Sequence, residues 1–198
     1  MSRATLKLLT RDKILDEGVS LLMEHGYHGT GLQQILDRVG VPKGSFYNYF
    51  GSKEEFGGEV IRHYIEPFIA LLERHLHLPN RSAAAALQAY FDELIGELER
   101  RGYKGGCLLG NLMGEIGDTS DHCRSALQDA VHGYRDKLGE GIARAQQEGD
   151  FRTDKPAAEL ADFLTDAWQG ALLLMKIEQS TQPLKACCHN LLGDLFRP

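Results

Sequence analysis

The sequence predicts an all-α protein of about nine helices, with three helices in an N-terminal head and a larger helical body behind them. Along most of the 198 residues, apolar side chains recur every three or four positions, which places them on one face of a helix. No run of β-branched residues alternates with polar residues, and no Asn-Gly-type hairpin turn separates such runs. Glycines, prolines and capping-box pairs fall between the periodic stretches, where helices should begin and end.

The first two helices are defined by a glycine stop and a capping signal. The first is expected over about residues 10–25, and Gly26 is its expected left-handed end. Thr30 and Gln33 have the spacing of a capping box, which predicts the start of a shorter second helix that Gly40 ends. The expected buried stripes are Ile14, Leu15, Val19, Leu21 and Leu22, then Ile35, Leu36 and Val39.

A third helix is expected over residues 42–49, because a proline in the first turn of a helix loses no hydrogen bond. Ser52 and Glu55 form a second capping box, and a long helix follows them. Pro67 is expected to break or kink that helix before it ends near residue 77.

The body is expected to span residues 54–198, with residues 1–53 as the head. Five helices follow the long one, and each has its own apolar stripe. They are expected at about residues 82–101, at residues 106–116, from Ser120 through Ala145, from a cap at Thr153 or Asp154 to Gln179, and from Pro183 through Leu195.

Composition indicates a globular chain, with 42% hydrophobic and 25% charged residues. The longest apolar run, Ala171–Met175, is far shorter than the roughly 20 residues of a membrane span. The N-terminus lacks the apolar stretch of a secretory signal, and four cysteines do not make a disulfide framework in a chain of this length. We therefore expect a cytoplasmic protein with no membrane partner, and no feature predicts a cofactor.

Residues 32–49 have the layout of a helix-turn-helix. Two short helices flank a tight turn at Gly40 and Val41, and a second helix of this length fits the major groove of DNA. Residues 1–53 carry seven Lys/Arg against five Asp/Glu, a net charge of +2, whereas the other 145 carry 15 against 23, a net charge of −8. One basic end on an acidic protein indicates that this end alone binds a polyanion.

The second helix of this motif carries side chains that suit DNA. Lys43 and Ser45 stand at its start, where the helix dipole and free N–H groups attract phosphate, and Gly44 allows a close backbone approach. Among the residues that follow, Tyr47, Tyr49 and Lys53 can bind phosphate, Asn48 can reach a base edge or the DNA backbone, and Phe46 and Phe50 face inward.

Three stretches, Gly26–Thr30, Val39–Phe50 and Ser52–Glu55, resemble the DNA-binding signature of TetR (tetracycline-repressor-like) transcriptional regulators. The resemblance covers about residues 10–56. It implies a three-helix DNA-binding head, a linking fourth helix and an all-α ligand-binding body. The DNA contacts that it implies are Thr30, Lys43, Gly44, Ser45, Tyr47, Tyr49 and Lys53, with Gln33 and Asn48 at positions that vary with the operator.

The same resemblance implies a repressor that binds a near-palindromic operator as a homodimer and is released by a small-molecule inducer. The last two helices of each chain would form the dimer, because the family dimerises there. The apolar stripes of these helices predict an interface made of Trp168, Ala171, Leu172, Met175, Leu184, Leu191 and Leu195.

The stretch from Gly105 to Asn111 is similar to a branch of the family that carries Gly-Cys-Leu at the start of the sixth helix. Some members of that branch respond to electrophiles or oxidants through the cysteine. A thiol in the first turn of a helix favours the thiolate, and Lys104 could add to this effect. Cys107 is therefore a candidate sensor. The alternative is a packing cysteine beside a non-covalent hydrophobic inducer.

Other function classes stay open on the sequence alone. An all-α enzyme with Cys107 as nucleophile would need a general base, and no histidine lies within a turn of it. A helical scaffold protein would use the helix-turn-helix only as structure. A metal site would have to draw on ligands without compact spacing and is not predicted; those residues are His122, Cys123, Cys187, Cys188 and His189.

Overall fold

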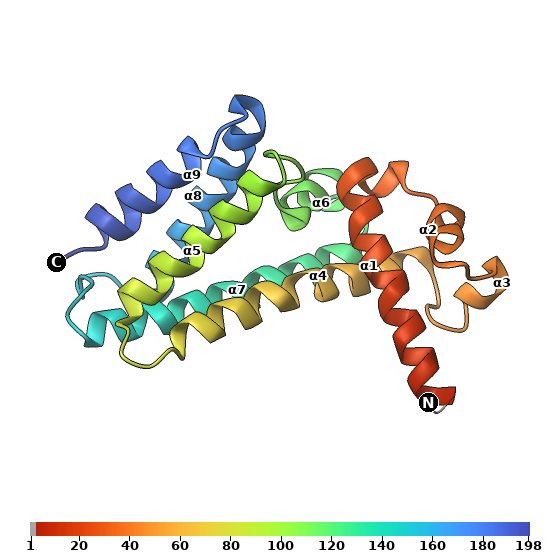
Figure 1. Cartoon of the computed structure of the whole chain (residues 1–198), viewed down its shortest axis with the longest axis horizontal. Helices are drawn as coiled ribbons and strands as arrows, with labels where there is room; N and C mark the ends of the chain where they lie inside the picture. The colour runs from red at the N-terminus through yellow and green to blue at the C-terminus, as the bar shows by residue number, and fades with distance from the viewer. Residues whose placement is uncertain (1–2) are drawn as a thin grey trace. The chain divides into compact units, whose positions relative to one another are not determined.

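The computed structural model describes residues 3–198, with side chains from residue 5 onward. This described part contains nine α-helices, one π-helix and no strand, so the all-α prediction is confirmed (Figure 1). The helices are α1 (Arg3–Gly29), α2 (Leu32–Val39), α3 (Lys43–Phe46), α4 (Lys53–Leu76), α5 (Ala83–Arg100), α6 (Leu108–Ile116), α7 (Asp121–Gln147), α8 (Ala157–Glu178), α9 (Gln182–Cys188) and the π-helix His189–Leu195.

The chain forms two compact units, which we call the head unit and the body unit. The head unit contains the residues up to Glu66 together with Leu108–Val131, and the body unit contains Pro67–Cys107 and His132–Pro198. The predicted boundary after residue 53 therefore differs from the observed division. The reason is packing: the first turns of α4 supply buried side chains to the head, and α6 packs against α1.

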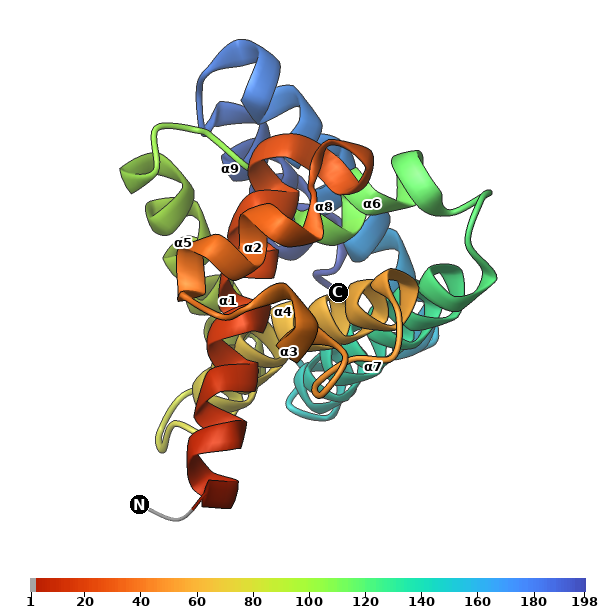
Figure 2. The ribbon, with the colours of Figure 1, turned by 90° about the vertical axis from the view of Figure 1, so that its right-hand side faces the viewer.

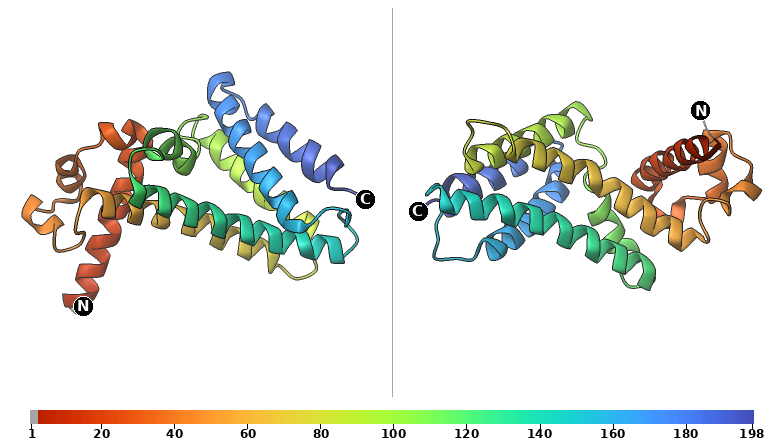
Figure 3. Two further views of the ribbon diagram at one scale, coloured as in Figure 1. Left: turned by 180° about the vertical axis from the view of Figure 1, so that it is seen from behind. Right: turned by 90° about the horizontal axis from the view of Figure 1, so that it is seen from below.

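Helix α1 is longer than predicted and is interrupted where the glycine signal lies. It begins at Arg3, and the Thr10 hydroxyl donates to the Leu6 carbonyl (2.9 Å) from within the helix instead of marking its start. Gly26 has φ 72°, as predicted for a left-handed stop, but a further helical turn follows it. Figure 3 shows the long N-terminal part of this helix in two views.

The predicted capping box at Thr30 is wrong. The N-cap of α2 is Gly31, without a side-chain cap. The Thr30 hydroxyl is buried and shares its proton instead between the carbonyls of Gly26 (2.6 Å) and Leu21 (3.1 Å). The end of α2 is as predicted, since Gly40 has φ 67° and donates its N–H to the Asp37 carbonyl.

Helix α3 is shorter than the predicted span of 42–49, because its last residues form turns in place of a continuing helix. The second capping box is confirmed: the Ser52 hydroxyl accepts from the Glu55 N–H (3.0 Å), and the Glu55 carboxylate accepts from the Gly51 N–H (3.0 Å). Pro67 does not break α4, which continues through it to Leu76.

The residues that begin α5, α8 and α9 differ in how they cap the helix. Helix α5 begins at Ala83, close to the predicted start, and Ser82 caps it by accepting from the Ala85 N–H (3.3 Å). The predicted cap of α8 at Thr153 or Asp154 is wrong, because Pro156 occupies that position and Asp154 pairs with Arg152. The last helix has a proline in its first turn, as predicted, and then continues as the π-helix, which the periodicity does not indicate.

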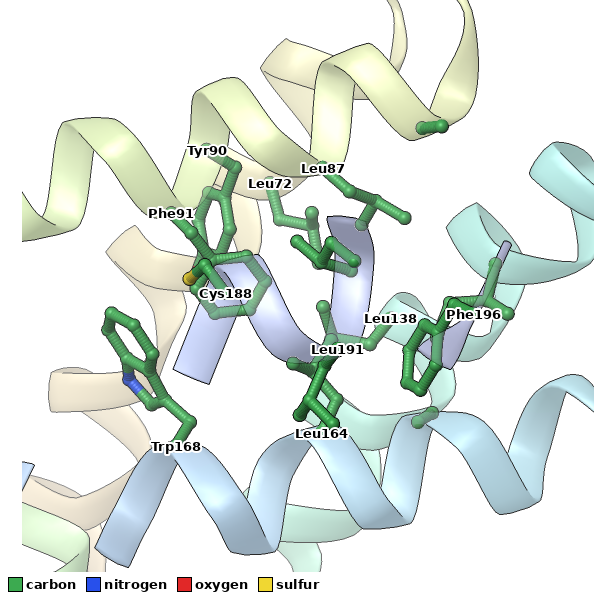
Figure 4. Close-up of a cluster of buried hydrophobic side chains, with 14 of the residues drawn as sticks. Leu72, Leu87, Tyr90, Phe91, Leu138, Leu164, Trp168, Cys188, Leu191 and Phe196 are labelled. Atoms are coloured by element: carbon green, nitrogen blue, oxygen red, sulfur yellow. The ribbon is translucent and has the colours of Figure 1, made fainter. Parts of the chain in front are cut away.

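The body unit is built around one apolar core (Figure 4). Aromatic rings from α5 and α8 meet in it, with Phe91 and Trp168 4.8 Å apart between ring centroids. Helices α8 and α9 lie side by side and both contribute to this core. The buried residues therefore include six of the seven predicted for the dimer interface, namely Trp168, Ala171, Leu172, Met175, Leu184 and Leu191.

The burial of these six side chains within the chain leaves them little surface for a second copy. Side chains that already fill the chain's own core cannot also cover a second copy. The opposite face of α8 is apolar and exposed instead, and of the predicted set only Leu195, 44% exposed, remains at the surface. The exposed apolar residues of α8 are Phe163, Leu173, Leu174 and Ile177, with the exposed Gly170 between them.

Candidate DNA interface and sensor cysteine

The helix-turn-helix is held by an aromatic cluster at the base of α3. Phe46 and Phe50 are almost fully buried and pack on Phe56 of α4, with ring centroids 5.7 Å and 4.9 Å from it. Because these two rings anchor one side of α3, the residues between them turn outward. The sequence predicted this orientation for both phenylalanines.

The outward side of α3 presents the predicted contact residues together. Lys43, Gly44 and Asn48 are exposed, and 63% of Tyr47 is exposed, so these four residues offer surface to a ligand. Figure 2 faces α2 and α3. A Cβ built on Gly44 would meet no atom within 4 Å, so the backbone at this point is open to an approaching ligand. Ser45 and Tyr49 are half-buried beside them.

Three predicted contact residues are engaged inside the head unit. Thr30 is 2% exposed and its hydroxyl is bonded internally, so its predicted DNA contact has no side-chain surface to make it. Gln33 is exposed, and its amide donates to the Asp37 carboxylate at 2.6 Å. The Lys53 ammonium donates to the Tyr27 carbonyl (3.0 Å), which leaves two further N–H groups for phosphate.

The structure adds Lys7 to the basic groups at this surface. Its Nζ lies 5.8 Å from the centre of the Tyr49 ring, within cation–π range. Arg11, one turn later, lies over Phe50 and pairs with Glu59 at 2.8 Å. The sequence showed these basic residues, but it predicted the helix only from residue 10. Lys7 was therefore not placed.

Cys107 lies at the end of a loop of left-handed residues. Gly105 (φ 82°) and Gly106 (φ 71°) adopt the left-handed conformation that this loop requires, and residues with a Cβ adopt it less readily. Cys107 directly precedes α6, so the prediction that it lies inside the first turn is wrong by one residue. It is half-buried, and the Gln169 amide donates to its sulfur at 3.3 Å.

The thiol has one polar neighbour, the Gln169 amide, and its loop is lined by the chain of a lysine. A Cβ on Gly106 would lie 3.2 Å from Cδ of Lys176, so this lysine packs its chain next to the cysteine loop. Burial, with a smaller contribution from Cys107, raises the pKa of Tyr90 and keeps that hydroxyl protonated at neutral pH. An amide and a protonated phenol are not general bases, so these groups do not supply the base that a cysteine-dependent enzyme needs.

The other cysteines are poor candidates for chemistry. Cys123 is fully buried in the head unit, and its thiol donates to the Glu54 carbonyl at 3.7 Å. Burial raises the pKa of the Cys187 thiol, and it raises the pKa of Cys188 to about 12, which disfavours both thiolates. Within the described residues no three His, Cys, Asp or Glu side chains gather as a metal site, and none of the helices is long and apolar enough to cross a membrane.

Comparison with known proteins gives two family matches along the chain. Residues 14–60 match the N-terminal profile described as bacterial regulatory proteins, tetR family, and residues 83–191 match the tetracyclin repressor-like C-terminal domain. The chain belongs to the TetR family. As a TetR-family member it is a DNA-binding transcriptional regulator, which agrees with the exposed face of α3.

Several relatives of this TetR-family chain are similar over most of their length. It is 36% identical over 174 residues to the HTH-type transcriptional repressor DhaR of Mycobacterium sp. (strain GP1), covering 88% of this chain and 86% of DhaR. It is 30% identical to the transcriptional repressor NemR of Escherichia coli (strain K12), covering 89% and 88%. The crystal structure of the reduced form of E. coli NemR superposes with a TM-score of 0.85 over 92% of this chain and 94% of that one, at 28% identity.

Proposed function

We propose that this chain is a transcriptional repressor that binds a near-palindromic operator as a homodimer and leaves it when a small-molecule electrophile or oxidant modifies Cys107. The observation that carries the proposal is the exposed group of Lys43 on α3 with Tyr47 and Asn48 in the turn that follows it, in a TetR-family head. Its relatives DhaR and NemR are named repressors. A regulator of chromosomal genes acts in the cytoplasm, and we propose no enzymatic activity.

On DNA, the side chains of α3 would divide into positioning and reading groups. Lys43 and the tyrosine hydroxyls reach phosphates, which position the head without sequence preference. Asn48 is the residue suited to a base edge, since an amide both donates and accepts. Two heads in successive major grooves, about 34 Å apart, require an operator with two related half-sites.

The dimer would form through the exposed face of α8. Phe163, Gly170, Leu174 and Ile177 are spaced by seven, four and three residues, which aligns them on one stripe of the helix. Ile177 is 77% exposed and Phe163 is 50% exposed, so the stripe is uncovered in the single chain. A two-fold axis would pack this stripe against its copy, with a glycine where the two backbones approach most closely.

Release would begin with the thiolate of Cys107. With an activated alkene such as a maleimide, the sulfur adds to one carbon of the double bond, the π electron pair moves to the other carbon, and a proton from water completes the adduct. No oxidant or leaving group is involved. The Gln169 amide donates to the sulfur, and the aliphatic chain of Lys176 lies beside Gly106, the residue before the cysteine.

The added group needs space, and the thiol is already half-buried between the left-handed loop and α8. An adduct would therefore displace the loop or the start of α6. It shifts the equilibrium toward release only to the extent that the displaced state accommodates the adduct better. The extent of release from DNA should therefore depend on the size of the group that the electrophile adds to Cys107.

The test uses purified protein and DNA from upstream of its own gene, with and without N-ethylmaleimide. Wild type should bind and then dissociate on alkylation. Cys107→Ser should bind equally well and remain bound, whereas Cys187→Ser is the matched control and should be released like wild type. Release of Cys107→Ser by the maleimide would overturn the sensor assignment and favour a non-covalent inducer. Unchanged operator affinity of both Lys43→Ala and Tyr47→Phe would count against the DNA face.

A further inference from the structure

The junction between α1 and α2 depends on a carboxylate from another helix. Gly26, at φ 72°, interrupts α1 and leaves the next N–H groups without their helical acceptors. Glu115 of α6 accepts both: Oε2 from the Tyr27 N–H and Oε1 from the His28 N–H, each at 2.7 Å. The carboxylate thus acts as an N-terminal cap for the turn that follows the break, supplied by a residue 87 or 88 positions away.

The rest of the junction is tied to α4 and to α1 itself. Lys53, the first residue of α4, donates to the Tyr27 carbonyl and lies 4.6 Å from the centre of its ring. The Thr30 hydroxyl binds the Gly26 carbonyl. Tyr27 is itself buried, and burial raises its pKa to about 12, so it stays neutral. Glu115 is therefore the contribution of α6 to a junction whose other polar groups are already bound.

Helix α6 is suited to carry a displacement to this point. Leu108, Leu109, Leu112 and Ile116 form its buried face, so it packs as a single rigid element against its neighbours, α1 among them. It starts directly after Cys107, and Glu115 stands roughly 10 Å further along its axis. A shift at the start of such a helix reaches its end almost undiminished.

We infer that Glu115 is a positioning residue for operator binding, through which α6 holds the α1–α2 junction and thereby the helix-turn-helix. This inference rests on the proposed function. With α6 in place, the carboxylate fixes the junction and α2 and α3 keep the orientation that DNA selects. When modification at Cys107 shifts α6, both hydrogen bonds are lost and the operator-bound orientation loses its support.

The close approach of the Glu115 carboxylate to the backbone at Gly26 supports a positioning role for Glu115. A Cβ on Gly26 would lie 2.6 Å from Oε2 of Glu115, so the backbone and the carboxylate are in close approach. Gly26 is the permitted residue here both because of its positive φ and because of this contact.

The direct test is amide hydrogen exchange at Tyr27 and His28, combined with operator binding. In Glu115→Gln one acceptor oxygen becomes a donor, so one of the two N–H groups loses its partner. The matched control is Asp118→Asn, an exposed acid three residues later that also loses one charge. Since a charge-assisted hydrogen bond is worth about ten- to a hundredfold in an equilibrium, exchange at these amides should rise at least about tenfold in Glu115→Gln and remain unchanged in Asp118→Asn.

Operator affinity should fall by a similar factor in Glu115→Gln, and N-ethylmaleimide should then produce a smaller further loss than in wild type. Alkylation of wild type should itself accelerate exchange at the same two amides. Unchanged exchange in Glu115→Gln, or faster exchange with the full maleimide response retained, would overturn the inference. If N-ethylmaleimide does not release the wild type from DNA, the proposed sensor role of Cys107 fails. The positioning role of Glu115 is then tested by operator affinity alone: weaker binding by Glu115→Gln than by Asp118→Asn supports it, and equal binding refutes it.

Discussion

The substitution Ile177→Asp tests the proposed dimer face quantitatively. Fully burying an isoleucine side chain stabilises an association by about 1.5–3 kcal/mol, and 77% of Ile177 is exposed in the single chain. Burial of the exposed part therefore contributes about 1–2 kcal/mol per copy. A two-fold interface contains the residue twice, so the substitution should weaken the dimer by about 2–4 kcal/mol, or about 30- to 1,000-fold in the dissociation constant.

Sedimentation velocity over a concentration series measures this change. Gln128→Asp, which adds the same charge at an exposed position of α7, is the control and should dimerise like wild type. Operator binding by Ile177→Asp should shift to higher protein concentration in parallel with dimerisation. A dimer dissociation constant equal to that of wild type would refute the assignment of this face. Loss of dimer in Gln128→Asp would show that added charge alone is responsible.

Three other substitutions probe the head and body. Lys43→Ala should lower the slope of log K against log salt by about 2 per dimer, since each copy loses one phosphate contact, whereas Lys185→Ala on α9 should leave the slope unchanged. Thr30→Val should lower the free energy of unfolding by about 1–3 kcal/mol in urea titration, because the Gly26 and Leu21 carbonyls lose the hydroxyl donor that they share. A hydrogen bond from His75 lowers the pKa of Glu93. Glu93→Gln should therefore have a lower free energy of unfolding than wild type near pH 7, and this difference should disappear as the pH falls below about 4. A difference that does not change with pH would contradict this cause.

The elements that sequence predicted well are those with local signals. Gly40 ends α2 because a left-handed residue is needed there, and Ser52 starts α4 because its hydroxyl accepts from the N–H three residues on. The inward Phe46 and Phe50 follow from helical spacing alone. Such features depend on a few neighbouring residues, so they can be deduced without knowledge of the rest of the chain.

The features that sequence missed depend on contacts between distant segments. An apolar stripe on α8 indicates a buried face, but it does not tell whether the core or a second copy covers it, and Trp168 and Met175, predicted for the dimer, lie in the core of the single chain. The Thr30 hydroxyl bonds to the carbonyls of Gly26 and Leu21, four and nine residues earlier, and not to a backbone N–H of α2 as its spacing from Gln33 indicated. Glu115 meets its backbone partners across more than 80 residues, and no local pattern reports that pairing.

The central claim is that α3 reads DNA in a two-fold symmetric complex. The most direct measurement is selection of operator sites from random-sequence DNA by the purified wild-type protein, with Tyr47→Ala and Asn48→Ala selected in parallel. The wild type should enrich a near-palindrome with half-sites about one helical turn apart, Tyr47→Ala should enrich no site, and Asn48→Ala should show a relaxed preference within each half-site. Failure of the wild type to enrich any sequence, or enrichment of the same site by all three proteins, would contradict it.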